Sequence, residues 1–136
     1  MNYAEQLGIT RHVTFAGAVD QDHILDFYQA ADIFVLPSFA EGLPVVLMEA
    51  MSMEIPCVTT AITGIPELIQ NGENGLLTAA SDTDGLADAV NRLIADPQMR
   101  RKLGEAGRRK VLSDYDLYKN SRHLYMTLSR RLSEIA

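Results

Sequence analysis

Two glutamates, Glu41 and Glu49, flank a segment in which an apolar run ends and a helix is predicted to begin. Residues 33–36 form the apolar run, and Pro44 favours the first position of the helix. The first amides of a helix have no carbonyl partner within it, and the helix dipole favours an anion beside them. Proline has no N–H to offer. The candidate donors are therefore the amides of Leu43, Val45 and Val46.

The two carboxylates suggest what accompanies the anion. A carboxylate beside a phosphate repels it, unless its task is to accept hydrogen bonds from hydroxyl groups. Glu49 shares a helical face with Val45 and Val46 and leans toward the helix N-terminus. Because acidic residues commonly bind ribose, the pattern suits a nucleotide sugar. The alternative is that both are exposed surface acids, although the apolar neighbours of Glu49 favour a mostly buried helix and a partnered carboxylate.

A sheet and several helices must position these groups. Strands are predicted at 13–16, 33–36, 56–60 and 75–77, and helices at 3–7, 22–31, 44–53, 65–69, 83–95, 97–112 and 115–135. The continuous apolar run at 33–36 is typical of a parallel strand buried on both faces. The alternation predicts a doubly wound α/β sheet with right-handed crossovers. Such sheets bind ligands beyond the carboxyl ends of their strands, where Glu41 lies.

Composition excludes several classes of protein. The 136 residues are 47% hydrophobic, which suits one globular domain over residues 1–136. One cysteine cannot build a disulfide framework or a cysteine-rich zinc site, and Cys57 is expected in the core. The three histidines show no metal-binding spacing, so no metal is expected. No apolar run is long enough to span a membrane, and the start shows no signal pattern, so a cytoplasmic setting is expected.

Charge is distributed unevenly along the chain. The formal net charge is −6, yet twelve acids and no Lys or Arg lie between His12 and Asn91. This acidity excludes electrostatic binding of nucleic acid, and the absence of Lys before residue 102 argues against a phosphoacceptor receiver domain. The basic residues from Arg92 onward are expected on solvated helix faces and at helix C-termini, with a basic face for a membrane or partner as the alternative.

The segment from Glu41 to Glu49 resembles the E-x7-E signature of family 4 (group 1) retaining glycosyltransferases, which have the GT-B fold. Further motifs of that family follow in order at 13–17, 31–38, 49–51, 55–60, 64–67 and 71–77. The resemblance implies a partial Rossmann-like, doubly wound parallel sheet. It would be the C-terminal GT-B subdomain without the first two strands of the order 3-2-1-4-5-6, so residues 33–36 would be strand 4.

The resemblance also implies roles for individual residues. Glu41 would be the catalytic residue, contacting the transferred sugar near its reacting carbon. Glu49 would bind the ribose, and the nucleobase would lie near Gly17 and Val19. Ser38 would either contact the donor or cap the loop. The expected donor-binding residues are Ser38, Gly42, Leu43, Val45, Val46, Glu49, Gly17 and Val19. No cofactor is expected beyond a UDP- or GDP-sugar substrate, and catalysis would rest on positioning and charge stabilisation.

Two positions depart from the family pattern. Glu54 and Thr63 stand where the family usually has glycine. If the backbone at Glu54 is left-handed, its side chain costs about 1 kcal/mol relative to glycine.

The remaining expectations concern partners. The whole enzyme would pass a sugar to a hydroxyl acceptor (a glycan, glycolipid or small molecule), as in polysaccharide biosynthesis. A peripheral position at the cytoplasmic side of the inner membrane is the alternative to a purely cytoplasmic one. Its N-terminal acceptor domain and its diphosphate-binding cations are expected upstream, so the chain alone should be inactive and bind UDP or GDP only in the millimolar range. Alternatives are a non-catalytic association module and a GT-B sugar-nucleotide epimerase, which the motif order disfavours. Residues 13–16 would pair directly with 33–36, or the exposed sheet edges would recruit a second chain.

Overall fold

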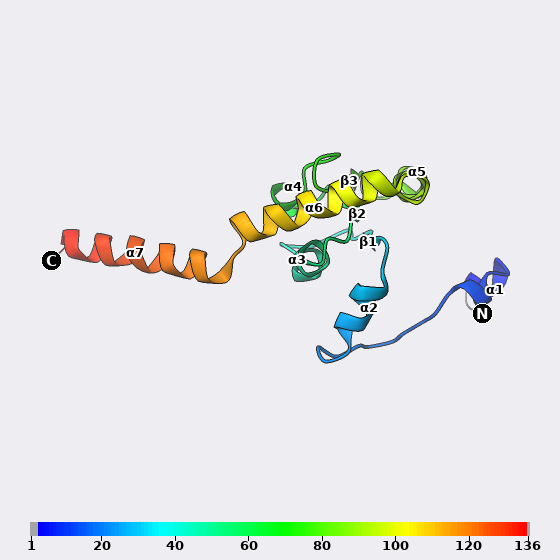
Figure 1. Cartoon of the computed structure of the whole chain (residues 1–136), viewed down its shortest axis with the longest axis horizontal. Coiled ribbons are helices and arrows are strands. Elements are labelled where there is room, and N and C mark those ends of the chain that lie inside the picture. Colours follow the sequence, from blue (N-terminus) through cyan, green and yellow to red (C-terminus); the bar gives the residue numbers. More distant parts are fainter. Residues whose placement is uncertain (1–2, 136) are drawn as a thin grey trace.

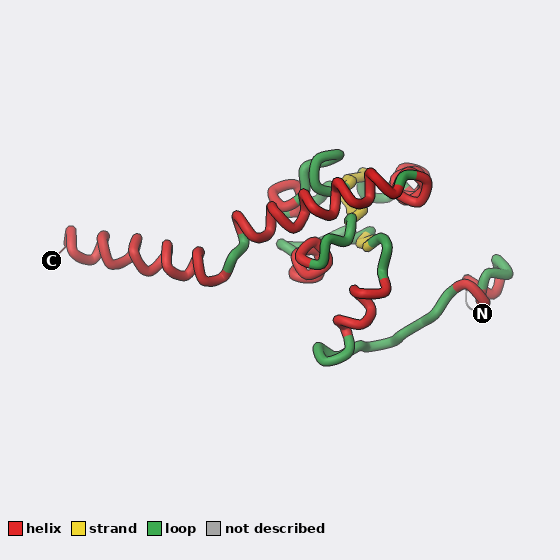
Figure 2. The backbone as a smooth tube through the Cα atoms, viewed as in Figure 1, coloured by secondary structure: helices red, strands yellow, loops and turns green. Residues whose placement is uncertain are grey.

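The computed structural model describes residues 3–135, with side chains for residues 3–131. Its sheet has three parallel strands in the order β1-β2-β3 (Figure 2). They are β1 (Phe34–Leu36), β2 (Cys57–Thr60) and β3 (Leu76–Thr78). In the register, Val58 of β2 lies opposite Val35 on one side and Leu76 on the other. Consecutive strands therefore lie side by side, as the doubly wound arrangement predicts.

Helices cover both faces of this sheet, which confirms the doubly wound arrangement (Figure 1). They are α2 (Ile24–Ala30), α3 (Val45–Ser52), α4 (Ile65–Leu68), α5 (Thr83–Ala95) and α6 (Pro97–Asp114). Cys57 packs into a core with α2, α3 and α4, whereas Val58 packs on the opposite face with α5. Burial raises the pKa of the Cys57 thiol to about 12, so this cysteine is an uncharged core residue.

Helix α6 contributes to both cores. Its Leu103 packs with Val58 on one face of the sheet, and its Val111 packs in the core that contains Cys57. Gly107 lies between these two residues, where an added Cβ would be 3.3 Å from the carbonyl oxygen of Asn74. The helix thus crosses the junction between the two layers.

Capping side chains place the ends of the C-terminal helices. The Asp82 carboxylate accepts from the amide of Gly85 at 2.9 Å, and α5 begins directly after Asp82, as predicted. Asp96 caps α6 in the same way. Two arginines confirm the expected placement of cations at helix C-termini. Arg100 donates to the Leu93 carbonyl at the end of α5 at 2.6 Å, and Arg108 donates to the Ser52 carbonyl at the end of α3 at 3.0 Å.

The N-terminal part differs most from the prediction. Residues 13–16 do not form a strand, and residues 14–19 make no backbone hydrogen bond within the described chain. They form an extended arm leading to α1 (Tyr3–Gln6) and η1 (Thr10–His12), which lie apart from the sheet (Figure 1). The expected direct pairing of 13–16 with 33–36 is therefore wrong. With no described strand beside its outer edge, β1 leaves Val35 38% exposed, so burial on both faces is wrong for β1 and holds for β2.

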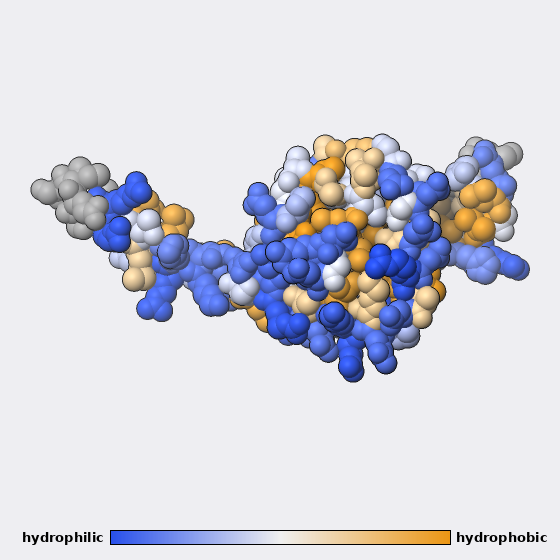
Figure 3. All heavy atoms as spheres, turned by 90° about the horizontal axis from the view of Figure 1, so that it is seen from above, coloured by the Kyte–Doolittle hydropathy of each residue, from blue (hydrophilic) through white to orange (hydrophobic). Residues whose placement is uncertain are grey.

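At the other end, α7 (Leu117–Ile135) projects from the body in the opposite direction to the arm (Figure 1). Large apolar side chains are exposed on both extensions, among them Phe15, Leu117 and Tyr118. Figure 3 shows apolar surface at the N-terminal end, around α1, and on α7 as well as on the body. None of the helices in the described part is long and apolar enough to cross a membrane.

The two departures from the family pattern lie in left-handed backbone, with φ of 61° at Glu54 and 41° at Thr63. The turn at Glu54 follows α3 and is pressed against α6 at Gly104, where an added Cβ would lie 1.9 Å from the Glu54 carbonyl oxygen. The Glu54 carboxylate also lies 3.8 Å from the Arg108 guanidinium, with both side chains about half exposed. At this turn the left-handed backbone favours glycine, whereas the ion pair with Arg108 favours the glutamate side chain.

Glu54→Gly is expected to raise the free energy of unfolding by about 0.5 kcal/mol. It relieves a left-handed cost of about 1 kcal/mol, while the added chain entropy and the lost exposed ion pair offset part of the gain. Urea denaturation measures the change. Glu54→Ala is the matched control because it removes the carboxylate and keeps the Cβ. Equal stabilisation by alanine and glycine would show that backbone strain is not the cause.

Candidate functional site

The loop that joins β1 to α3 lies at the carboxyl end of the sheet and is held from β2. Thr59 donates from Oγ1 to the carbonyl of Leu36 at 2.8 Å, and Thr60 donates to the carbonyl of Ser38 at 2.6 Å. Both threonines are buried, so their hydroxyls need these partners. The last two residues of β2 thereby fix the path of the loop where it leaves β1.

The loop after β2 contacts the next part of the same segment, at Glu41 and Gly42. Thr63 donates from Oγ1 to the Glu41 carbonyl, and its left-handed backbone brings it there. Next to it, Gly64 packs so closely that an added Cβ would lie 3.0 Å from the Gly42 carbonyl oxygen. The backbone at Glu41 and Gly42 is therefore held by contacts from a neighbouring loop as well as by its own chain.

The Glu41 side chain is oriented within the loop itself. Ser38 donates from Oγ to the Glu41 Oε1 at 2.9 Å, and both side chains are half-buried. This contact fits the loop role expected for Ser38, and its contact with a donor stays a prediction. The second carboxylate oxygen of Glu41 has no hydrogen-bond partner among the described residues.

Helix α3 begins with unused donors, as its sequence predicts. Pro44 is the N-cap and not the first helical residue, and it offers no side-chain cap. In the described chain no carbonyl accepts from the amides of Gly42, Leu43, Val45 or Val46. Val45 is 60% exposed and Val46 is also exposed, so this end of α3 faces solvent. An anion can therefore approach these amides.

Glu49 lies on the same exposed face of α3, so its expected burial is wrong. The helix buries one side, through Leu47, Ala50 and Met51, where it packs into the core with the sheet and α6. Glu49 nevertheless has a partner. The hydroxyl of Tyr28, on α2, donates to its Oε2 at 2.8 Å. The carboxylate is thus accessible and held in place.

A cleft of about 450 Å³ opens between α2 and α3 beside this pair. Gln21, Tyr28 and Glu49 supply polar groups to it, and the apolar lining includes Ile24 and Met48. Gly17 and Val19, expected near the nucleobase, do not line it. Gly17 is exposed with φ of 70°, and Val19 is half-buried in the segment leading to Gln21.

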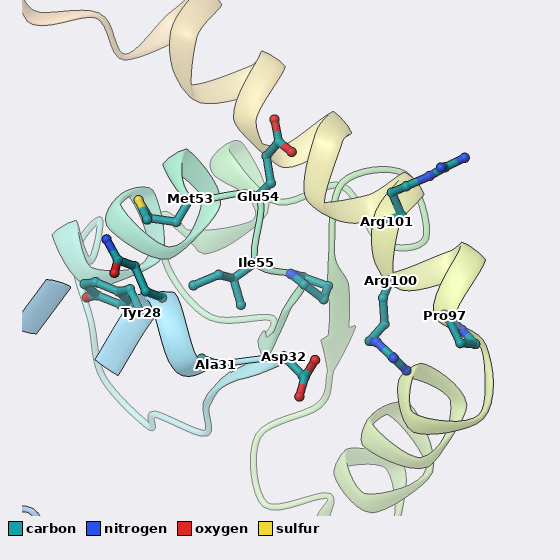
Figure 4. A pocket seen from close by; sticks show the side chains of 11 residues that line it. Tyr28, Ala31, Asp32, Met53, Glu54, Ile55, Pro97, Arg100 and Arg101 are labelled. Carbon is teal, nitrogen blue, oxygen red and sulfur yellow. The ribbon is translucent and has the colours of Figure 1, made fainter. Parts of the chain in front are cut away.

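A second cleft, of about 460 Å³, adjoins the first, since Tyr28 and Met53 line both, and it extends to the end of the sheet where Asp32 precedes β1 and Pro56 precedes β2. Figure 4 shows Asp32 and Ile55 on one side of it and Arg100 on the other. None of the residues expected to bind a donor lines this cleft. The predicted residues between Ser38 and Glu49 lie instead on the loop after β1 and on α3, whereas Gly17 and Val19 lie in the N-terminal segment before α2.

Sequence reasoning missed the residues that hold the site. In the sequence, Tyr28 looks like one of the apolar residues of the helix predicted at 22–31. Thr59, Thr60 and Thr63 look like ordinary strand and loop residues. Their hydroxyl groups were the signal that could have identified them, since a hydroxyl on a buried face needs a hydrogen-bond partner. Among the described residues, no three His, Cys, Asp or Glu side chains gather to hold a metal. The site offers amides to an anion and two oriented carboxylates to hydroxyl groups.

The family described as "Glycosyl transferases group 1" matches residues 1–110. N-acetyl-alpha-D-glucosaminyl L-malate synthase of Bacillus anthracis is 35% identical over 115 residues, which are 85% of this chain and 30% of that protein.

Solved structures give the same picture. Sucrose-phosphate synthase from Thermosynechococcus elongatus is 30% identical with a TM-score of 0.86, over 98% of this chain and 33% of that one. HepE of Anabaena in complex with UDP is 28% identical with a TM-score of 0.87, over 93% of this chain and 35% of that one. HepE is also known in complex with UDP-glucose. The chain thus spans about a third of the length of these relatives.

Proposed function

Because the chain belongs to the group 1 glycosyl transferases and has the α/β fold of GT-B enzymes, we propose that it is the donor-binding part of a retaining, family 4 glycosyltransferase. The enzyme transfers a sugar from a nucleoside diphosphate to a hydroxyl acceptor. One observation carries the proposal: the unused amides at the start of α3 lie between two carboxylates that are each held by a hydroxyl group. Ser38 holds Glu41, and Tyr28 holds Glu49.

The chemistry of each group suggests what it binds. The amides of Gly42 to Val46 hold the diphosphate, with the positive end of the α3 dipole behind them. Glu49 accepts from the ribose hydroxyls at the cleft between α2 and α3. Glu41 accepts from hydroxyls of the transferred sugar through the oxygen that Ser38 leaves unused. Catalysis then rests on holding the donor and stabilising the departing diphosphate, without a metal.

The proposed donor is a UDP-sugar, supported by the UDP and UDP-glucose complexes of HepE. No Lys or Arg lies between residues 13 and 91, so the site as described meets a diphosphate with amides alone. We place the acceptor site and the cations that neutralise the diphosphate in other parts of the enzyme, since the relatives are about three times longer. Binding by this chain alone is accordingly weak.

An NMR titration of the chain tests the proposal. UDP is expected to bind in the millimolar range and to shift the amide signals of Gly42, Leu43, Val46 and Glu49. Uridine, which lacks phosphates, should shift Glu49 and leave the Gly42 and Leu43 signals nearly unchanged, whereas pyrophosphate should do the reverse. The amides of Ala89 and Leu103, on the far side of the sheet, serve as internal controls.

Two outcomes would count against the proposal. Shifts that spread evenly over the chain, or that centre on the cleft near Arg100, would contradict the assigned site. A dissociation constant below about 10 µM would contradict the view that the cations for the diphosphate come from elsewhere.

A further inference from the structure

The contact between Tyr28 and Glu49, which are 21 residues apart in the chain, joins α2 to α3. Tyr28 is only 7% exposed, and its ring packs against Phe34 of β1 with centroids 6.0 Å apart. Figure 4 shows Tyr28 at the junction of α2, which carries it, and α3. Its position is therefore set by α2 and by the core that it shares with β1 and α3.

The hydroxyl of Tyr28 has one acceptor, the Oε2 of Glu49. Burial and the bond to Glu49 raise the pKa of the phenol to about 12, so Tyr28 stays a donor throughout the physiological range. The bond occupies one oxygen of the carboxylate. The other oxygen stays available on the exposed side of α3, at the cleft.

We propose that Tyr28 is a positioning residue, which fixes the rotamer of Glu49 so that its carboxylate is ready for the ribose hydroxyls. The inference rests on the proposed function, in which Glu49 binds ribose. An exposed glutamate on a helix samples several rotamers and loses that freedom when it binds a ligand. The bond from a buried, rigid phenol removes this freedom before the nucleotide arrives, and such pre-organisation increases affinity.

The positioning role predicts an effect confined to ligands with ribose hydroxyls. Tyr28→Phe removes one oxygen atom and keeps the ring that packs on Phe34. It is expected to weaken UDP binding about fivefold, as for the loss of one net hydrogen bond. It should leave almost unchanged the binding of 2′,3′-dideoxy-UDP, which has no ribose hydroxyl for Glu49 to accept.

The experiment measures both nucleotides by NMR titration on five forms of the chain: unmodified, Tyr28→Phe, Glu49→Gln, the double variant of these two, and Tyr125→Phe. Tyr125 lies on α7 and is 72% exposed, so Tyr125→Phe makes the same chemical change away from the site and should match the unmodified chain. Thermal unfolding of each variant confirms that the domain is folded at the temperature of the titration.

The inference is supported if Tyr28→Phe lowers the preference for UDP over 2′,3′-dideoxy-UDP about fivefold, and if adding it to Glu49→Gln causes no further loss. An equal loss for both nucleotides would overturn it, because a merely structural residue acts on both. If Glu49→Gln removes the preference and Tyr28→Phe keeps it, the positioning role alone is wrong. If the unmodified chain shows no preference, the ribose role of Glu49 fails and the positioning role fails with it.

Discussion

Replacing Gly104 with alanine is expected to lower the free energy of unfolding by about 3 kcal/mol, a large part of the stability of a domain this size. The new Cβ would lie 1.9 Å from the carbonyl oxygen of Glu54 and 2.8 Å from its carbonyl carbon. Both are backbone atoms of a tight left-handed turn, so they cannot move aside as the end of a side chain can. Relief requires α6 to move away from α3. Urea denaturation followed by circular dichroism measures the loss.

Gly107→Ala is the matched control, one helical turn further along α6. There the nearest atom to an added Cβ is the Asn74 carbonyl oxygen at 3.3 Å, which a small adjustment can accommodate. Alanine also has the better helix propensity, by about 1 kcal/mol. The control is therefore expected to lie close to the unmodified chain. If both variants unfolded at the same urea concentration, the close approach of α6 to the Glu54 turn would not be what requires glycine at residue 104.

The two carboxylates of the site are expected to respond differently to the choice of ligand. Glu49→Gln should weaken UDP and UDP-glucose alike, by tenfold or more, because a hydrogen bond to a charged group is lost from the nucleoside side. Glu41→Gln should leave UDP within about twofold and weaken UDP-glucose several-fold, since only the sugar reaches Glu41. NMR titrations of both ligands against the two variants give the four comparisons.

Glu73→Gln makes the same change in charge at an exposed position away from the loop and α3, and it should not alter either affinity. If all three variants weakened UDP equally, the effect would come from net charge and not from contact. If Glu41→Gln reduced UDP binding as much as Glu49→Gln, the assignment of sugar to one acid and ribose to the other would be wrong.

The parts of the fold that local sequence determines were predictable. Asp82 and Asp96 are side-chain caps that need no tertiary partner, and the two helices they begin start where predicted. The order of the three strands follows from the rules for crossovers. The unpaired amides at the start of α3 were also predictable from local sequence, because Pro44 lies between a strand and a helix and begins the helix without a side-chain cap.

What depended on distant partners was not predictable. Residues 13–16 have the composition of a strand, yet a strand exists only where another strand pairs with it, and none does here. Glu49 was expected to be buried because its neighbours in sequence are apolar, whereas burial depends on what packs over that face. The partner of Glu49 could not be read from spacing either, because Tyr28 reaches it from another helix.

The course of α6 across both cores has a consequence for how the domain opens. With Leu103 in one core and Val111 in the other, this helix cannot detach from one face of the sheet without uncovering the second. The two layers should therefore open together as one cooperative unit, with no partly open form in which one core stays closed. Helix α3 rests on α6 through the Glu54 turn, so the ligand amides exist only in molecules where that unit is closed. Variants far from the site that loosen α6 would then reduce the fraction of binding-competent molecules without touching the nucleotide.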